Sequence, residues 1–179
     1  MVLEHRDIHG NQSADRRELR ELVFRLARAI DRNDREGILA CYHSDAVDDH
    51  GEFKGPAEGF ADWVAMLHRE RVESMSHLIA NHLVEIAGDE ARGETYVHVY
   101  LSGRPTGGQR FLMTGIGRYL DRFERRDGVW RIARRLVLTD IEHTDILPVT
   151  EADGLVRQLN PGLASLDDPS YAHFGTSIR

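Results

Sequence analysis

The stretch MSHLIANHLVEI, residues 75–86, alternates polar and apolar residues. A period of two is typical of a β-strand, whose successive side chains point to opposite faces. His77, Ile79 and Asn81 therefore share one predicted face, and His82 lies on the other. An unpaired polar group among apolar neighbours costs about 1–3 kcal/mol. The face of His77 and Asn81 is predicted either to satisfy both groups structurally or to line a pocket with chemistry to perform.

The chain after this stretch continues as strands to nearly residue 145. Four strands are predicted, at 75–86, 92–102, 109–124 and 129–140. Turn residues separate them, and Asp127-Gly128 between the last two is a strong hairpin signal. Because sequential strands joined by short turns pair antiparallel, these residues predict one antiparallel sheet.

Three helices are predicted before the sheet. The first runs from about residue 15 to 32, opens with a capping box of Asp15 and Glu18, and carries one apolar stripe. Asp34 is predicted to cap a short second helix. A turn and strand follow at 45–53, and Pro56 suits the first turn of a third helix. The predicted fold class is α+β: a cone-shaped α+β barrel, with three N-terminal helices packed on a strongly curved antiparallel sheet that encloses a pocket.

The length of 179 residues suits one domain with short extensions. We expect an N-terminal arm at 1–13, a cone-shaped domain of helices and sheet at 14–147, and a C-terminal extension at 148–179. The extension is expected to pack on the body or on a partner subunit, because its turn-rich sequence needs support.

Composition excludes several classes of protein. A net charge of −7 argues against a nucleic-acid binder, which needs a basic face to meet phosphates. No apolar run approaches the ~18 residues of a membrane span. Cys41 is the one cysteine and cannot form an internal disulfide, so the cytoplasm is the expected location.

Two groups of residues are candidates for catalysis. Asp31 falls at the margin of the first helix's apolar stripe, and a carboxylate there can hold the tautomer of His77 while that histidine abstracts a proton. The alternative is a helix-end aspartate in water and a histidine hydrogen-bonded within the sheet. Arg135 can stabilise a developing anion, and its alternative is a solvated strand face.

A metal site is not predicted. His77 and His82 point to opposite faces of their predicted strand. The cluster Asp45, Asp48, Asp49 and His50 has suitable atoms but no recognised zinc or calcium spacing. We expect no metal and no cofactor.

The second predicted strand of the sheet has a polar and aromatic face, made of Glu94, Tyr96, His98 and Tyr100. Such amphipathic rings suit a subunit interface, and an ordinary solvated face is the alternative. We expect a homo-oligomer, either a dimer or a trimer.

Five motifs carry a resemblance to a known family. In chain order they are AIDRND at 29–34, YHSDAV at 42–47, Gly55-Pro56, SHLIAN at 76–81 and FERRDGVWRI at 123–132. In this order and spacing, the chain resembles SnoaL-like members of the nuclear-transport-factor-2-like superfamily over roughly residues 14–145. The resemblance implies the same cone fold for the body of the chain.

Within that superfamily the chain resembles the pattern of hexachlorocyclohexane dehydrochlorinase, and it resembles scytalone dehydratase more distantly. The dehydrochlorinase pattern implies catalytic roles for Asp31, His77 and Arg135, with Asn81 as a substrate-binding neighbour. The fold further implies a substrate pocket whose predicted lining is Val97, Val99, Phe111, Met113 and Tyr119, capped by Phe24 and Trp63.

These expectations lead to a function. The chain is predicted to be a cofactor-independent lyase or isomerase that acts on a small, largely apolar molecule, of a cyclic, polyketide or steroid-like kind. His77 would remove a proton from carbon. One alternative is a non-catalytic ligand-binding or structural subunit of the same fold. Another is an isomerase of the ketosteroid type, with a carboxylate as the base.

Overall fold

The computed structural model describes residues 8–104, 109–147, 160 and 162–175, so residues 1–7 of the expected arm and 148–159 of the expected extension lie outside it. The helices are α1 (Ile8–Asp31), α2 (Arg35–Ala40), α3 (Ala57–Glu70) and α5 (Pro169–Phe174). The strands are β1 (Tyr42–Asp49), β2 (Lys54–Pro56), β3 (Val72–Ala87), β4 (Glu90–Gly103), β5 (Arg110–Arg126) and β6 (Val129–Leu147).

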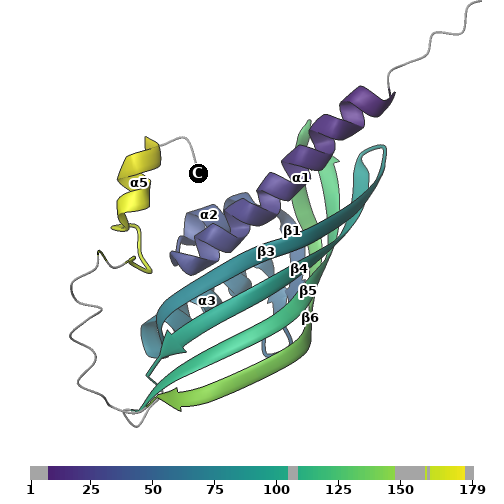
Figure 1. The fold of residues 1–179 in the computed structure, drawn as a ribbon. Helices are drawn as coiled ribbons and strands as arrows, with labels where there is room; N and C mark the ends of the chain where they lie inside the picture. The colour runs from purple at the N-terminus through teal and green to yellow at the C-terminus, as the bar shows by residue number, and fades with distance from the viewer. Residues whose placement is uncertain (1–7, 105–108, 148–159, 161, 176–179) are drawn as a thin grey trace, which may run out of the picture.

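The strands form one six-stranded sheet in the order β2-β1-β6-β5-β4-β3. Strands β3 to β6 pair antiparallel with their sequence neighbours, as the short turns predict, whereas β1 runs parallel to β6. Figure 1 shows the long strands curving together, with α2 and α3 behind them and α1 running along β3. The predicted α+β fold is confirmed, with a sheet that stays open between its edge strands β2 and β3.

Helix α1 starts earlier than the sequence predicts. It begins at Ile8, so the predicted capping box at Asp15 is wrong. Asp15 is instead a buried residue of the helix, and its carboxylate accepts hydrogen bonds from Trp130 Nε1 at 3.0 Å and from Arg125 at 3.0 Å. These contacts tie α1 to β5 and β6, and they give the carboxylate a tertiary role in place of a cap.

The C-terminal end of α1 is set by local chemistry. Asn33 has a left-handed backbone (φ 51°), a conformation that commonly ends helices. Asp34 then caps α2 through its side chain, which accepts from the Gly37 N–H at 2.9 Å, as predicted. Asp31 is therefore the last residue of α1, at the helix end that faces the interior.

Strand β3 contains a bulge that reverses the predicted faces of two residues. Ile79 pairs with Val97, but His82 pairs with Thr95, so β3 has one extra residue between the two pairs. Asn81 is consequently exposed, and His82 turns inward, where its Nδ1 lies 2.8 Å from Thr95 Oγ1. Strict alternation from residue 75 therefore predicts the wrong face for both.

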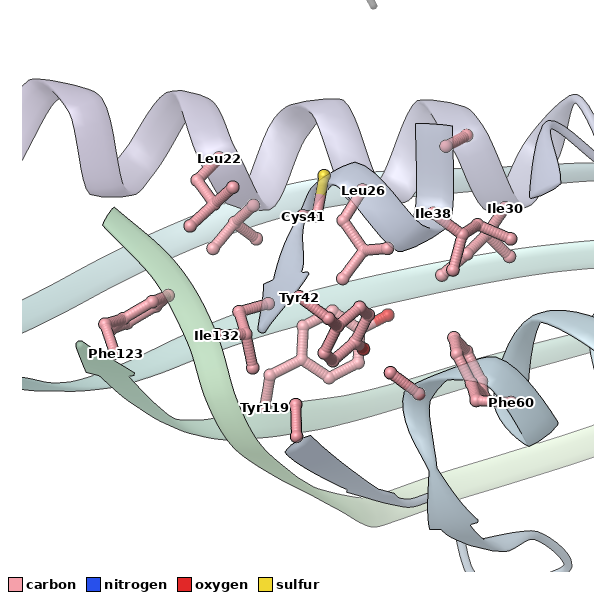
Figure 2. Packing of buried hydrophobic residues seen from close by; sticks show 14 of the residues in the cluster. Leu22, Leu26, Ile30, Ile38, Cys41, Tyr42, Phe60, Tyr119, Phe123 and Ile132 are labelled. Carbon is pink, nitrogen blue, oxygen red and sulfur yellow. The ribbon is translucent and has the colours of Figure 1, made fainter. Parts of the chain in front are cut away.

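The hydrophobic core lies between α1 and one end of the sheet. Figure 2 shows Leu22, Leu26 and Ile30 of α1 facing Phe123 and Ile132 of the sheet. Full burial of each such side chain contributes about 1.5–3 kcal/mol. Tyr42, Phe60 and Tyr119 continue the same core.

The described part of the C-terminal extension packs on α1. Tyr171 of α5 donates to Asp34 at 2.9 Å, and Arg28 donates to Ser170 at 3.0 Å while its guanidinium lies over the Tyr171 ring. Among the described helices, none is long and apolar enough to cross a membrane.

Candidate active site

A cavity of about 610 Å³ lies between the helices and the sheet, and Phe60 and Tyr119 of the core are among the residues that line it. Phe111 and Met113, near the start of β5, line it, whereas Phe123, near the end of β5, belongs to the core. Six predicted pocket residues line this cavity: Trp63, Val97, Val99, Phe111, Met113 and Tyr119. The volume falls within the ~300–1,000 Å³ typical of small-molecule sites.

Two other predicted pocket residues lie elsewhere. Asn81 is exposed beyond the β3 bulge and is not among the described residues that line the cavity. Phe24 is 43% exposed and lines a smaller groove of about 270 Å³, which also includes Asp31 and His77. The Asp31–His77 pair therefore stands between the main cavity, which His77 lines, and this groove.

Asp31 and His77 are in direct contact. Asp31 Oδ1 lies 2.6 Å from His77 Nδ1, and Asp31 Oδ2 accepts from the backbone N–H of His77 at 3.0 Å. Because an ionised carboxylate only accepts hydrogen bonds, Nδ1 carries a proton and Nε2 is left at the cavity end of the ring. The His77 side chain is 8% exposed, and the Asp31 side chain is 11% exposed.

The position of Asp31 is one that helix energetics disfavours. A carboxylate in the last turn of a helix faces the negative end of the macrodipole, which costs roughly 0.3–1 kcal/mol. The two N–H groups of His77 compensate by donating to both carboxylate oxygens. The arrangement fixes the imidazole in one orientation and one tautomer, which is what a general base needs.

Arg135 does not meet its predicted role as a pocket arginine. It is 1% exposed, and its Nε and second terminal nitrogen donate to the two Asp121 oxygens at 2.7 and 2.8 Å. Its guanidinium lies 4.0 Å from the centre of the Tyr119 ring. Burial alone would lower the pKa of Arg135, but Asp121, together with Tyr42 and Tyr119, raises it, and the pKa lies above its ordinary value. The Arg135 guanidinium, which was expected to contact the substrate, is therefore bound to Asp121 and packed on the Tyr119 ring.

His50 lines the cavity and forms a second aspartate–histidine pair with the buried Asp48, and sequence reasoning considered these two residues only as metal ligands. His50 Nδ1 contacts Asp48 Oδ1, and Tyr42 donates to Asp48 Oδ2 at 2.5 Å. The His50 ring stacks on Phe60 with 4.5 Å between centres. Asp48 is near the end of β1 and His50 follows that strand, so strand alternation did not predict that the two side chains would meet.

The acidic cluster around His50 is not arranged around an ion. No group of three or more His, Cys, Asp or Glu residues in the described part of the chain is placed to hold a metal. Asp45 pairs with Arg126, and Asp49 pairs with Lys54.

Ionisable groups lie at two depths in the cavity. Glu52, Arg71 and Glu142 line it but are exposed, so they lie toward the opening. His50 and His77 are half-buried and each is held through Nδ1 by an aspartate. The interior therefore presents two oriented imidazoles to a ligand whose other surroundings are mainly apolar.

A curved, open sheet with three N-terminal helices on one side and a deep apolar cavity is the cone architecture of nuclear-transport-factor-2-like proteins. The chain belongs to the family of the SnoaL-like domain, whose model matches residues 11–136. The resemblance carried by the five sequence motifs is thereby confirmed.

Solved structures share the fold. A Mycobacterium tuberculosis protein of unknown function is 25% identical, with a TM-score of 0.65 over 76% of this chain and 78% of that one. A putative scytalone dehydratase from Novosphingobium aromaticivorans is 19% identical, with a TM-score of 0.66 over 80% and 94%. A hexachlorocyclohexane dehydrochlorinase from Novosphingobium barchaimii is 21% identical, with a TM-score of 0.65 over 78% and 94%. No curated protein matches the chain.

Proposed function

We propose that the protein is a cofactor-independent lyase or isomerase in which His77, oriented by Asp31, removes a proton from a carbon atom of a small hydrophobic molecule. The substrate would be cyclic, polyketide-like or steroid-like, because the cavity is large and mainly apolar. The proposed location is the cytoplasm, because a chain with one cysteine fits a reducing compartment.

One observation carries this proposal: the 2.6 Å contact between Asp31 and His77 at the wall of an open apolar cavity. A histidine fixed in this way supplies a base near neutral pH, and proton transfer by a positioned base contributes about 10²–10⁴-fold in rate. The names of the dehydratase and the dehydrochlorinase add support by analogy of fold.

The geometry argues against both alternatives. A non-catalytic subunit predicts a filled cone or separated side chains, whereas this chain has a cavity and a direct contact. A carboxylate base of the ketosteroid type needs a free oxygen, and both Asp31 oxygens accept hydrogen bonds from His77. His77 is therefore the better candidate for the base.

The proposal can be tested without knowing the natural substrate. A panel of cyclic and aryl ketones in deuterated water reports proton abstraction, because the α-hydrogen is replaced by deuterium and its NMR signal disappears. His77→Ala should slow exchange of any accepted ketone by about 10²–10⁴-fold, and Asp31→Asn should slow it strongly by spoiling the tautomer.

His98→Ala is the matched control, since His98 lies on the neighbouring strand opposite Leu78 and does not line the cavity among its described residues. Exchange that survives in His77→Ala at the wild-type rate, or a wild-type protein that exchanges no member of the panel, contradicts the proposal.

A further inference from the structure

We propose that His50 is the general acid of the cavity and that the group it protonates is a hydroxyl leaving group, which makes the reaction a dehydration. This inference rests on the proposed function, in which His77 is the base. His50 would donate a proton to the leaving group, whereas His77 takes one from carbon. The family resemblance did not identify His50.

The position of His50 is fixed from three sides. It lies in the turn between β1 and β2, where its backbone N–H donates to the Phe53 carbonyl at 2.8 Å. Its Nδ1 is held by Asp48, and its ring is stacked on Phe60. With Nδ1 so occupied, Nε2 is the ring nitrogen left for a ligand in the cavity that His50 lines.

The charges around His50 place its ring where it can balance a buried carboxylate. Asp48 is 0% exposed, and a fully buried carboxylate needs a compensating positive charge. The nearby buried cation, Arg135, is already neutralised by Asp121 in a two-hydrogen-bond pair. The other partner of Asp48 is the neutral Tyr42 hydroxyl, whose pKa is raised first by burial and then by Asp48 itself. His50 is thus the group placed to balance Asp48.

The Asp31–His77 pair differs from the Asp48–His50 pair in the burial of its carboxylate and in the other groups around it. Asp31 retains some exposure and borders the solvent-facing groove, together with Arg28 and Arg32. Its second oxygen is stabilised by a backbone N–H. Asp31 therefore needs a cationic His77 less than Asp48 needs a cationic His50. Two histidines in such different surroundings can divide the roles of acid and base between them.

The stacked Phe60 ring favours the same assignment, because the face of an aromatic ring attracts a cation within about 6 Å of its centre. Tyr119 is the competing donor in the cavity wall, since burial raises its pKa and keeps its phenol protonated. Its ring, however, lies beneath Arg135 in the core.

The reaction balances with these two residues alone. His77 Nε2 takes the proton from the carbon next to an activating carbonyl. The released electron pair forms the new carbon–carbon double bond as the bond from the adjacent carbon to the hydroxyl oxygen breaks. The hydroxyl oxygen takes the proton of His50 Nε2 and departs as water. Hydroxide leaves poorly without a proton, whereas a halide leaves as the free anion, so an acid at this place favours a hydroxyl substrate.

The protonation states can be measured directly. In protein with ¹⁵N-labelled histidine, NMR at neutral pH should show both ring nitrogens of His50 protonated and one bare nitrogen on His77. His50→Gln and His77→Gln assign the signals, and Asp48→Asn should convert His50 to the neutral ring while His77 stays as it was. A bare Nε2 on His50 in the wild-type protein overturns the proposal.

Kinetics test the role of the proton. The probes are a β-hydroxy derivative of a ketone that the wild-type protein exchanges, and the β-(para-nitrophenoxy) derivative of the same ketone, whose leaving group departs as a stable anion. His50→Gln should slow the loss of water by about 10²–10⁴-fold more than it slows the loss of nitrophenoxide.

The exchange assay also separates the two proposals. Persistent exchange in His50→Gln reports a folded site with an intact base, so a failure of the acid assignment is distinguishable from a failure of the His77 assignment. The proposal is overturned if His50→Gln slows the elimination of both leaving groups equally or slows neither. It is also overturned if Tyr119→Phe, and not His50→Gln, selectively slows the elimination of water. If His50→Gln does not fold, the wild-type protein still decides: it must expel water and nitrophenoxide at similar rates, and a strong preference for nitrophenoxide contradicts an acid.

Discussion

Arg135 and Asp121 face each other in the core, where both side chains are at most 1% exposed. A buried ion pair of this kind adds little net stability by itself, because desolvating the charges offsets their attraction. Removing one partner is different, since it leaves an unpaired charge in the interior. The pair also supports Tyr119, whose ring separates the Arg135 guanidinium from the cavity that Tyr119 lines.

Arg135→Met is therefore expected to lower the free energy of unfolding by about 3–5 kcal/mol, because Asp121 loses its cation. Urea unfolding measures the loss. Arg134→Met is the matched control, since Arg134 is the next residue along β6 and is exposed. If Arg135→Met is as stable as the wild-type protein but no longer catalyses deuterium exchange, this prediction is contradicted, and Arg135 contacts the substrate.

The sequence pattern singled out Asp31 and His77 as a pair, and the family resemblance implied the six predicted residues that line the cavity. Both inferences depend on local spacing in the sequence. Arg135 was placed on the correct strand but given the wrong surroundings. Its partner Asp121 lies on β5 and meets it through the register of two long strands. That register depends on the bulges of the folded sheet, which local periodicity does not contain.

At the scale of the element, the bulge in β3 has the largest consequence. It turns His82 inward between Thr95 and the core, and His82 Nε2 is buried without a hydrogen-bond partner among the described residues. Burial lowers the pKa of His82, with the Asp121 carboxylate opposing and Arg20 adding to the effect. A proton on this ring would create a buried donor with no acceptor.

This geometry predicts an acid-labile strand. The unfolded chain binds a proton at the ordinary histidine pKa of about 6.5, whereas folded His82 binds it at a lower pH. The contribution of His82 to stability is therefore present above about pH 6.5 and lost as the pH falls through the lowered pKa of the folded state.

Thermal unfolding from neutral pH down to about pH 5 should show this decline. His82→Gln should remove part of it, and His143→Gln should not, because His143 is an exposed side chain at the far end of β6. Identical declines in the wild-type protein and His82→Gln would contradict this assignment.

At the scale of the whole molecule, the outer face of the sheet remains uncovered by the described helices. Leu78 pairs with His98, His98 with Ile116, and Ile116 with Ile141, so one row crosses β3 to β6. Leu78 and Ile141 are 52% and 60% exposed. Three of the four side chains in this row, Leu78, Ile116 and Ile141, are exposed and apolar, and an exposed apolar patch is typical of an association surface.

We expect this row to bind a second copy of the chain, in the dimer or trimer that the sequence suggested. Light scattering coupled to size exclusion should report a mass of two or three chains for the wild-type protein. Ile141→Glu should shift the mass to one chain, and Val129→Glu, at the other end of β6, should not. A wild-type monomer would contradict the expectation.

The helices, the meander of four strands and the aspartate at the end of α1 follow from residues close together in the chain. Apolar periodicity, the Asn33 helix end and the Asp127-Gly128 turn act through neighbouring backbone groups, so local pattern is enough to predict them. The inward turn of His82, the Asp121–Arg135 pair and the cavity with its second histidine depend on bulges, register and packing between distant segments. They exist only once the sheet has curved over the helices, because each is satisfied by a partner that the sequence places far away or on an adjoining strand.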